Sequence, residues 1–152
     1  MTLRRVVVTG LGALTPIGND VMSYWDGLVS GKSGADYITY FDTSKFKTQF
    51  ACELKGYDPL NHFDRKEARK LDKFAQYALV CSEEAIQDSK LDLDSIDKTR
   101  VGVIWGSGIG GLETFQNEVT AYAEGDGTPR YNPFFIPKMI PDIAPGVISI
   151  KY

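Results

Sequence analysis

The sequence predicts an α/β domain. Two apolar runs, residues 4–9 and 101–105, have the composition of buried strands, and each is followed by a glycine-rich turn. A segment with helical spacing comes after each turn, and alternation of strand and helix is typical of α/β folds. The 152 residues give room for one domain, but two strong strands are few for a complete sheet. We therefore expect the chain to be a piece of something larger.

Composition excludes several classes of protein. With 43% hydrophobic and 24% charged residues, the chain resembles soluble globular proteins and not disordered or collagen-like ones. A net charge of −3 is atypical of general nucleic-acid binders, and no apolar run has the length of a membrane span. The N-terminus lacks the apolar region of a secretory signal. Two cysteines, Cys52 and Cys81, are too few for a disulfide scaffold, so we expect a reduced, cytoplasmic location.

Two helices stand out in the first two thirds of the chain. Asn19 or Asp20 is expected to cap a helix over residues 21–29, which ends at the turn formed by residues 30–34. The clearest helix spans residues 66–87, because its apolar positions gather within one arc.

The remaining segments are less regular. Residues 35–61 have only short β-like pieces, residues 90–98 form an acidic loop, and residues 112–124 are predicted to be helical. Prolines recur every fourth residue from Pro129, which excludes one regular helix there, although helical turns can start at Pro133 or Pro137.

The turn after the second predicted strand contains Gly106, Gly108 and Gly111 in the pattern G-x-G-x-x-G. Such a turn can present backbone N–H groups to the phosphates of a dinucleotide. The alternative is a tight turn in which glycine permits close packing. The first turn has Thr15 where a third glycine would stand, which argues against a dinucleotide site and favours the tight turn.

No complete catalytic constellation is visible. His62 is the only histidine, Cys52 and Cys81 have no C-x-x-C partner, and the hydrolase pattern G-x-S-x-G is absent. A metal site and a histidine-based triad are therefore not expected.

Four cations, Lys66, Arg69, Lys70 and Lys73, recur at positions i, i+3, i+4 and i+7 and would share one helix face. On spacing alone a solvated face is the simpler interpretation. The alternative is a docking patch for an acidic partner, which would stand out on an otherwise acidic chain.

Two adjacent aromatic residues, Phe134 and Phe135, lie between Pro133 and Pro137. They are expected either to pack in a core or to form an apolar anchor at a subunit interface or ligand tunnel.

Together these segments resemble the β-ketoacyl-acyl carrier protein synthases of the elongating type II kind. Related polyketide ketosynthases are the nearest group with which they can be confused. The resemblance runs along the whole chain and rests on residues 6–19, 31–34, 65–74, 106–112 and 133–137.

The resemblance implies a thiolase-like fold of two similar layered α/β halves, of which this chain is part of the first. It also implies a homodimer that acts in cytoplasmic fatty-acid elongation, without a cofactor. In the family, a cysteine takes the acyl chain from acyl carrier protein, and malonyl-loaded carrier protein loses carbon dioxide and attacks the thioester. Two histidines and an oxyanion hole assist this Claisen condensation.

The family's nucleophilic cysteine and both histidines come after the point reached at Tyr152, and Cys52, Cys81 and His62 do not match their motifs. We therefore expect residues 1–152 to be the N-terminal portion of a ketosynthase domain, incomplete before the nucleophile and inactive alone.

The resemblance implies binding roles instead. It assigns carrier-protein docking to Lys66, Arg69 and Lys70, the acyl pocket to Gly108 and Ile109, and a contact across the dimer to Phe134. The alternatives are a non-catalytic module that binds an acidic protein and a nucleotide-binding α/β protein that uses the Gly106 turn.

Overall fold

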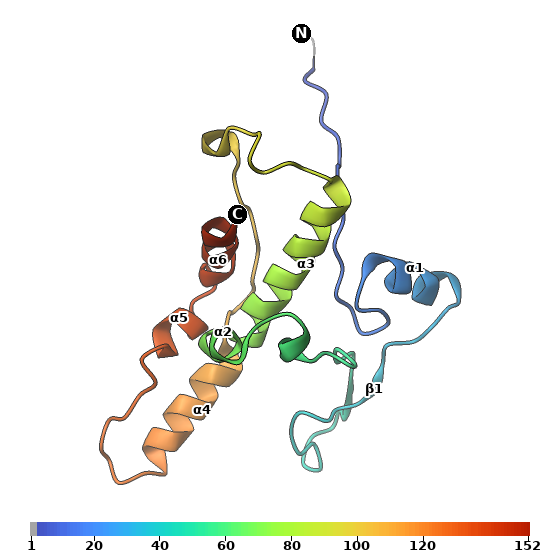
Figure 1. The fold of residues 1–152 in the computed structure, drawn as a ribbon. Coiled ribbons are helices and arrows are strands. Elements are labelled where there is room, and N and C mark those ends of the chain that lie inside the picture. Colours follow the sequence, from blue (N-terminus) through green and yellow to red (C-terminus); the bar gives the residue numbers. More distant parts are fainter. Residues whose placement is uncertain (1–2) are drawn as a thin grey trace. The chain divides into compact units, whose positions relative to one another are not determined.

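A computed structural model describes residues 3–152 (Figure 1). Its contacts divide the chain into two compact units, Met1–Tyr57 with Glu83–Lys90 and Asp58–Ser82 with Leu91–Tyr152. In chain order the elements are α1 (Val21–Val29), β1 (Asp36–Tyr37), β2 (Phe50–Ala51), α2 (Arg65–Lys70), α3 (Lys73–Ser89), α4 (Leu112–Ala123), α5 (Phe135–Met139) and α6 (Ile143–Lys151). Within residues 3–152, no helix has both the length and the apolar character needed to cross a membrane.

In the first unit, α1 confirms the predicted helix and selects Asp20 as its cap. The Asp20 carboxylate accepts a hydrogen bond from the backbone N–H of Ser23 (2.7 Å), and the Ser23 hydroxyl accepts one from the N–H of Asp20 (3.3 Å). This reciprocal capping box satisfies two N–H groups that a helix start leaves unpaired. Residues 35–61 are mostly irregular, as predicted, with β1 and β2 paired antiparallel over two residues each.

The strand predicted over residues 4–9 is wrong for this structure. Val6 and Val8 are 89% and 80% exposed, and the segment carries no strand assignment. The chain is instead held just after this segment, where the N–H of Leu11 donates to Asp88 (2.9 Å) and the N–H of Ala13 to Glu84 (2.8 Å). A strand needs a hydrogen-bonded neighbour, and none of the described residues supplies one here.

The prediction of one helix over residues 66–87 is wrong, because the segment forms two helices, α2 and α3. Leu71 adopts an extended backbone (φ −113°, ψ 139°), and the carbonyl of Asp72 accepts the N–H groups of Ala75 and Gln76 at 3.1 Å. The buried side chain of Gln76 donates to the carbonyls of Ala68 (3.0 Å) and Leu71 (3.2 Å). These bonds satisfy carbonyl groups at the end of α2 and begin α3 at a new angle.

The second unit also contains α4, α5 and α6. The prediction over residues 112–124 is confirmed by α4. A hydrogen-bonded turn starts at Pro133, as predicted, with the N–H of Phe135 donating to Asn132 (2.8 Å), and it leads into α5. The proposed start at Pro137 is wrong, because Pro137 lies within α5. Pro137 and Pro145 occupy the third positions of α5 and α6, where the N–H has no acceptor within the helix, so proline removes no hydrogen bond. The apolar core of this unit consists of Phe63, Ala75, Ala78, Leu79, Val80, Ala144 and Ile148.

The second predicted strand, over residues 101–105, is also wrong for this structure. The segment is not assigned as a strand, Ile104 is 99% exposed and Val101 is 53% exposed. The N–H of Val101 bonds to the carbonyl of Lys98 (3.2 Å) in a local turn, and among the described residues no neighbouring strand pairs with this segment or covers it.

Candidate functional site

The exposed helix α2 carries four cations, Arg65, Lys66, Arg69 and Lys70. We call the last three the basic surface. Their spacing of three and four residues places them on one side of the helix. Asp64 fixes the start of α2, because its carboxylate accepts the N–H groups of Lys66 (2.7 Å) and Glu67 (2.8 Å). A negative cap at a helix N-terminus is favourable for the helix dipole.

Lys73 does not belong to the basic surface, so the predicted stripe of four cations is wrong in its last member. The break at Leu71 and Asp72 puts Lys73 on α3. Its ammonium group lies 3.0 Å from the Glu113 carboxylate at the start of α4. This exposed ion pair neutralises the Lys73 charge and connects the first turns of two helices.

The structure brings Phe134 to the basic surface. The Lys70 ammonium lies 5.8 Å from the centre of the Phe134 ring, within the range of a cation–π contact. Asn132 positions this ring, because its side-chain oxygen accepts the N–H of Phe134 (2.9 Å) and its own N–H donates to Glu118 (3.0 Å). Phe134 remains 40% exposed.

Phe135 points to a different environment. Its ring stacks on Phe115 at 6.3 Å and on Tyr131 at 5.6 Å between ring centres. Phe135 therefore packs against its neighbours, whereas Phe134 is half-exposed beside a cation.

The turn after residues 101–105 has an exposed half and a packed half. Gly108 and Ile109 are exposed, and Ile109 is 66% accessible. Gly110 has a positive φ of +86°, and a Cβ there would collide with the Met139 carbonyl. A Cβ on the buried Gly111 would collide with the Lys138 carbonyl. Close approach to the end of α5 accounts for Gly110 and Gly111, which favours the tight-turn interpretation at Gly111, whereas a Cβ on Gly106 or Gly108 would meet nothing.

A groove of about 310 Å³ adjoins the basic surface at Lys70. Leu79 forms its buried part and Ile150 its exposed part. Its lining is Glu67, Lys70, Leu71, Leu79, Val147, Ile150 and Lys151.

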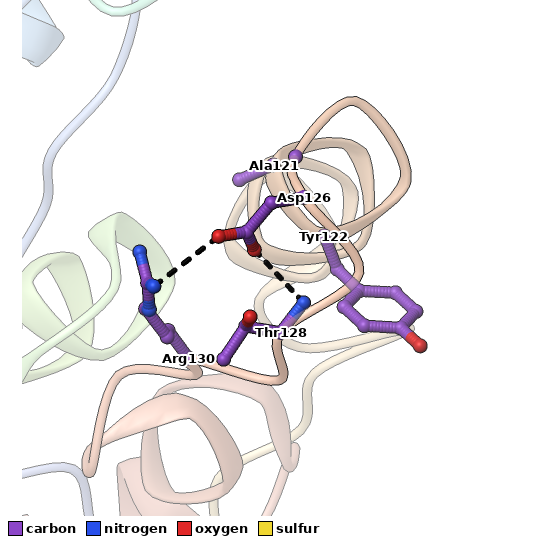
Figure 2. A pocket seen from close by; sticks show the side chains of 6 residues that line it. Ala121, Tyr122, Asp126, Thr128 and Arg130 are labelled. Atoms are coloured by element: carbon purple, nitrogen blue, oxygen red, sulfur yellow. Dashed lines mark hydrogen bonds and ion pairs between the residues drawn. The ribbon is translucent and has the colours of Figure 1, made fainter.

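A second hollow of about 360 Å³, which the sequence did not point to, lies at the end of α4 (Figure 2). Asp126 accepts the N–H of Thr128 (2.9 Å), and Arg130 lies 3.3 Å from its other oxygen. The Thr128 backbone bond, with help from its side chain, holds the pKa of Asp126 below its usual value. The charges of Asp126 and Arg130 compensate each other on this exposed turn.

Cys52, Cys81 and His62 have separate surroundings in the structure. Cys52 belongs to the first unit, whereas Cys81 and His62 belong to the second. Cys52 is exposed, Cys81 is half-buried on α3, and the His62 ring lies beside Phe63. The part of the chain that the structure describes contains no cluster of three or more possible metal ligands.

Comparison with known families decides the class of this domain. Residues 3–152 match the model of the N-terminal domain of β-ketoacyl synthases. The chain belongs to the β-ketoacyl synthase family. This β-ketoacyl synthase domain is 46% identical over 147 residues to the 3-oxoacyl-[acyl-carrier-protein] synthase 2 of Staphylococcus aureus (strain COL), and 43% identical over 148 residues to that of Synechocystis. It spans 35% of the length of each relative, and each match covers 97% of this chain.

Solved ketosynthases share the fold of this β-ketoacyl synthase domain. The ishigamide ketosynthase/chain length factor matches with a TM-score of 0.85 and 28% identity, over 97% of this chain and 36% of its own. A type II polyketide acyl-carrier protein complexed with its ketosynthase matches with a TM-score of 0.78 and 28% identity, over 96% and 39%. The predicted α/β class, as part of a thiolase-like fold, is therefore confirmed. The two segments predicted as long strands, residues 4–9 and 101–105, nevertheless have no strand partner here.

Proposed function

We propose that this chain is the N-terminal portion of a 3-oxoacyl-[acyl-carrier-protein] synthase that elongates fatty acids. Support comes from the name and the 46% identity of the Staphylococcus aureus relative, of which the chain spans 35%. We call the longer protein the full-length synthase. Its reaction is the decarboxylative Claisen condensation of malonyl-carrier protein with an acyl thioester, and we expect it to act as a cytoplasmic homodimer.

The catalytic cysteine and histidines would come from the rest of the full-length synthase. Cys52, Cys81 and His62 occupy neither the motif of the nucleophile nor those of the histidines. We therefore expect residues 1–152 alone to bind but not to condense, with no catalytic residue and no cofactor of their own.

Docking of acyl carrier protein is assigned to the basic surface. The observation that carries this assignment is that Lys66, Arg69 and Lys70 lie on one side of an exposed helix. Among residues 3–152, no ion pair engages any of the three. Cations without an internal ion pair are available to an acidic surface, which they attract over a distance of about 10 Å. One relative of known structure is a ketosynthase in complex with its acyl-carrier protein.

The acyl pocket is assigned to Gly108 and Ile109, and the dimer contact to Phe134. Gly108 and Ile109 would line the acyl pocket, and their exposure leaves them accessible to a ligand or to the rest of the full-length synthase. Phe134, half-exposed beside Lys70, would reach across the dimer to the partner's pocket.

The test reverses the charge of the basic surface in the full-length synthase: Lys66→Glu, Arg69→Glu and Lys70→Glu together. We expect kcat/KM for carrier-bound acyl substrates to fall about 100-fold, since each reversal replaces an attraction of up to about 1 kcal/mol by a repulsion. The kcat/KM for the same acyl group on a carrier-free thioester should stay within twofold, roughly the error of a kinetic comparison.

The matched control reverses three other exposed cations, Lys45, Lys47 and Lys98, which changes the net charge by the same amount. If both triple variants lose the same activity, the effect is one of overall charge and the docking assignment is wrong. An unchanged dependence on the carrier protein in the first variant would also contradict it.

A polyketide-type ketosynthase is the second candidate, because the ketosynthase seen with its carrier protein belongs to a type II polyketide synthase at 28% identity. The 46% identity to a 3-oxoacyl synthase favours the fatty-acid reaction. Analysis of the products formed from a saturated acyl-carrier protein distinguishes the two.

A further inference from the structure

Asp72, the residue that separates α2 from α3, also contacts the start of α4. Its carboxylate oxygen Oδ2 accepts a hydrogen bond from the hydroxyl of Thr114, a buried residue in the first turn of α4. A Cβ placed on Gly111 would stand 3.0 Å from the same oxygen. Asp72 therefore lies directly against the packed half of the glycine turn.

The other side of Asp72 is fixed to the basic surface. Its carbonyl accepts the N–H of Gln76, and the Gln76 side chain in turn holds the carbonyls of Ala68 and Leu71 at the end of α2. These bonds connect the end of α2 to the backbone of Asp72, so a rotation of α2 would strain them.

The glycine turn is in turn fixed to the segment that carries Phe134. The N–H of Gly111 donates to the carbonyl of Met139 at the end of α5 (2.9 Å). Phe134, directly before α5, contacts Lys70 on α2. The contacts thus form a closed ring from α2 through Asp72, Thr114 and Gly111 to α5 and back to α2.

We propose that Asp72 and Thr114 are a positioning pair that couples docking at the basic surface, through Gly111, to the shape of the glycine turn, whose exposed half contains Gly108 and Ile109. The inference rests on the proposed function, since it takes the docking and pocket roles from there. Neither residue contacts the acyl group; both act through the turn. Docking of an acidic partner on α2 would then change how the turn accommodates the acyl chain.

The test is a double-mutant cycle in the full-length synthase. Arg69→Ala and Ile109→Ala are made singly and together, and kcat/KM is measured for a long acyl-carrier protein. With Thr114 present, we expect kcat/KM of the double variant to differ about fivefold from the value obtained by multiplying the two single-variant effects. With Thr114→Val, which keeps the shape but removes the hydroxyl donor, the departure should fall below about 1.5-fold.

Two further variants separate positioning from simple loss of stability. Thr114→Ser retains the hydroxyl and should retain the coupling. Lys73→Gln breaks the exposed ion pair between the same two helix turns but leaves Asp72 and Thr114 in place, so it should also retain the coupling. If Thr114→Val does not fold, Thr114→Ala takes its place, because it also removes the hydroxyl donor while leaving Asp72 unchanged.

The outcomes distinguish this inference from the proposed function. If Arg69→Ala alone weakens carrier-dependent kcat/KM but the cycle is additive with Thr114 present, the positioning pair is refuted and the docking assignment remains. Coupling that persists in Thr114→Val also refutes the pair. If Arg69→Ala together with Lys66→Ala leaves carrier dependence unchanged, the docking assignment itself is wrong.

Discussion

The side chain of Gln76 fixes the end of the helix that carries the basic surface, so Gln76→Leu should loosen α2 selectively. Gln76 is 6% exposed and donates to the carbonyls of Ala68 and Leu71 at 3.0 and 3.2 Å. Each neutral hydrogen bond contributes about 1 kcal/mol net, so the loss of both amounts to roughly 2 kcal/mol. Because α2 has only six residues, it is not stable without such contacts.

Amide hydrogen exchange measures this loss directly. A loss of roughly 2 kcal/mol corresponds to about 30-fold faster exchange of the amides of Ala68, Arg69 and Lys70 through local opening of α2. The affinity of the Gln76→Leu variant for acyl carrier protein should also fall, since the three cations lose their fixed arrangement.

The matched control is Gln87→Leu, the same substitution on the same helix. Gln87 is exposed, and its side chain donates only a long bond of 3.4 Å to Glu83 among the hydrogen bonds described. Gln87→Leu should leave the amide hydrogen exchange of α2 unchanged. Equal exchange rates of the α2 amides in both variants would refute the assignment of helix α2's stability to Gln76.

Two further predictions concern the pocket and the first helix. Ile109→Phe in the full-length synthase should lower kcat/KM for long acyl acceptors more than for short ones, because the larger ring narrows the pocket; an unchanged chain-length profile would contradict the assignment. The Ser23 backbone N–H holds the pKa of Asp20 below its usual value, so its cap stabilises fully above about pH 3.9 and is lost as pH falls through the lower folded pKa. Asp20→Asn, which retains the cap but not the charge, should flatten the acid side of the stability curve measured by urea unfolding.

Local chemistry made the helices predictable. The Asp20 capping box and the apolar spacing of residues 21–29 agree with α1, and α4 begins and ends within one residue of its prediction. The break between α2 and α3 was not predictable in this way. The apolar spacing continues across Leu71, and the break depends on the Asp72 carbonyl and on a glutamine that reaches back to α2.

The candidate site shows the same division. The three cations of the basic surface follow from helical spacing, but the position of Phe134 beside Lys70 depends on Asn132 and Glu118, which are distant from α2 in the sequence. The contact of Asp72 with Thr114 could not be predicted from the sequence either, since the two residues are 42 positions apart.

Residues 4–9 and 101–105 show the limit of predicting strands from an apolar pattern. Val6, Val8 and Ile104 have the composition of buried strand residues, yet they are largely exposed here. A buried strand needs hydrogen-bonding neighbours and a covered face, and both are properties of a whole sheet. The chain spans only 36% of the ketosynthase that it matches with a TM-score of 0.85. We therefore expect the remaining part of the full-length synthase to pair with and cover these segments, in which case Val8→Lys would impair folding of the full-length synthase more than of this chain alone.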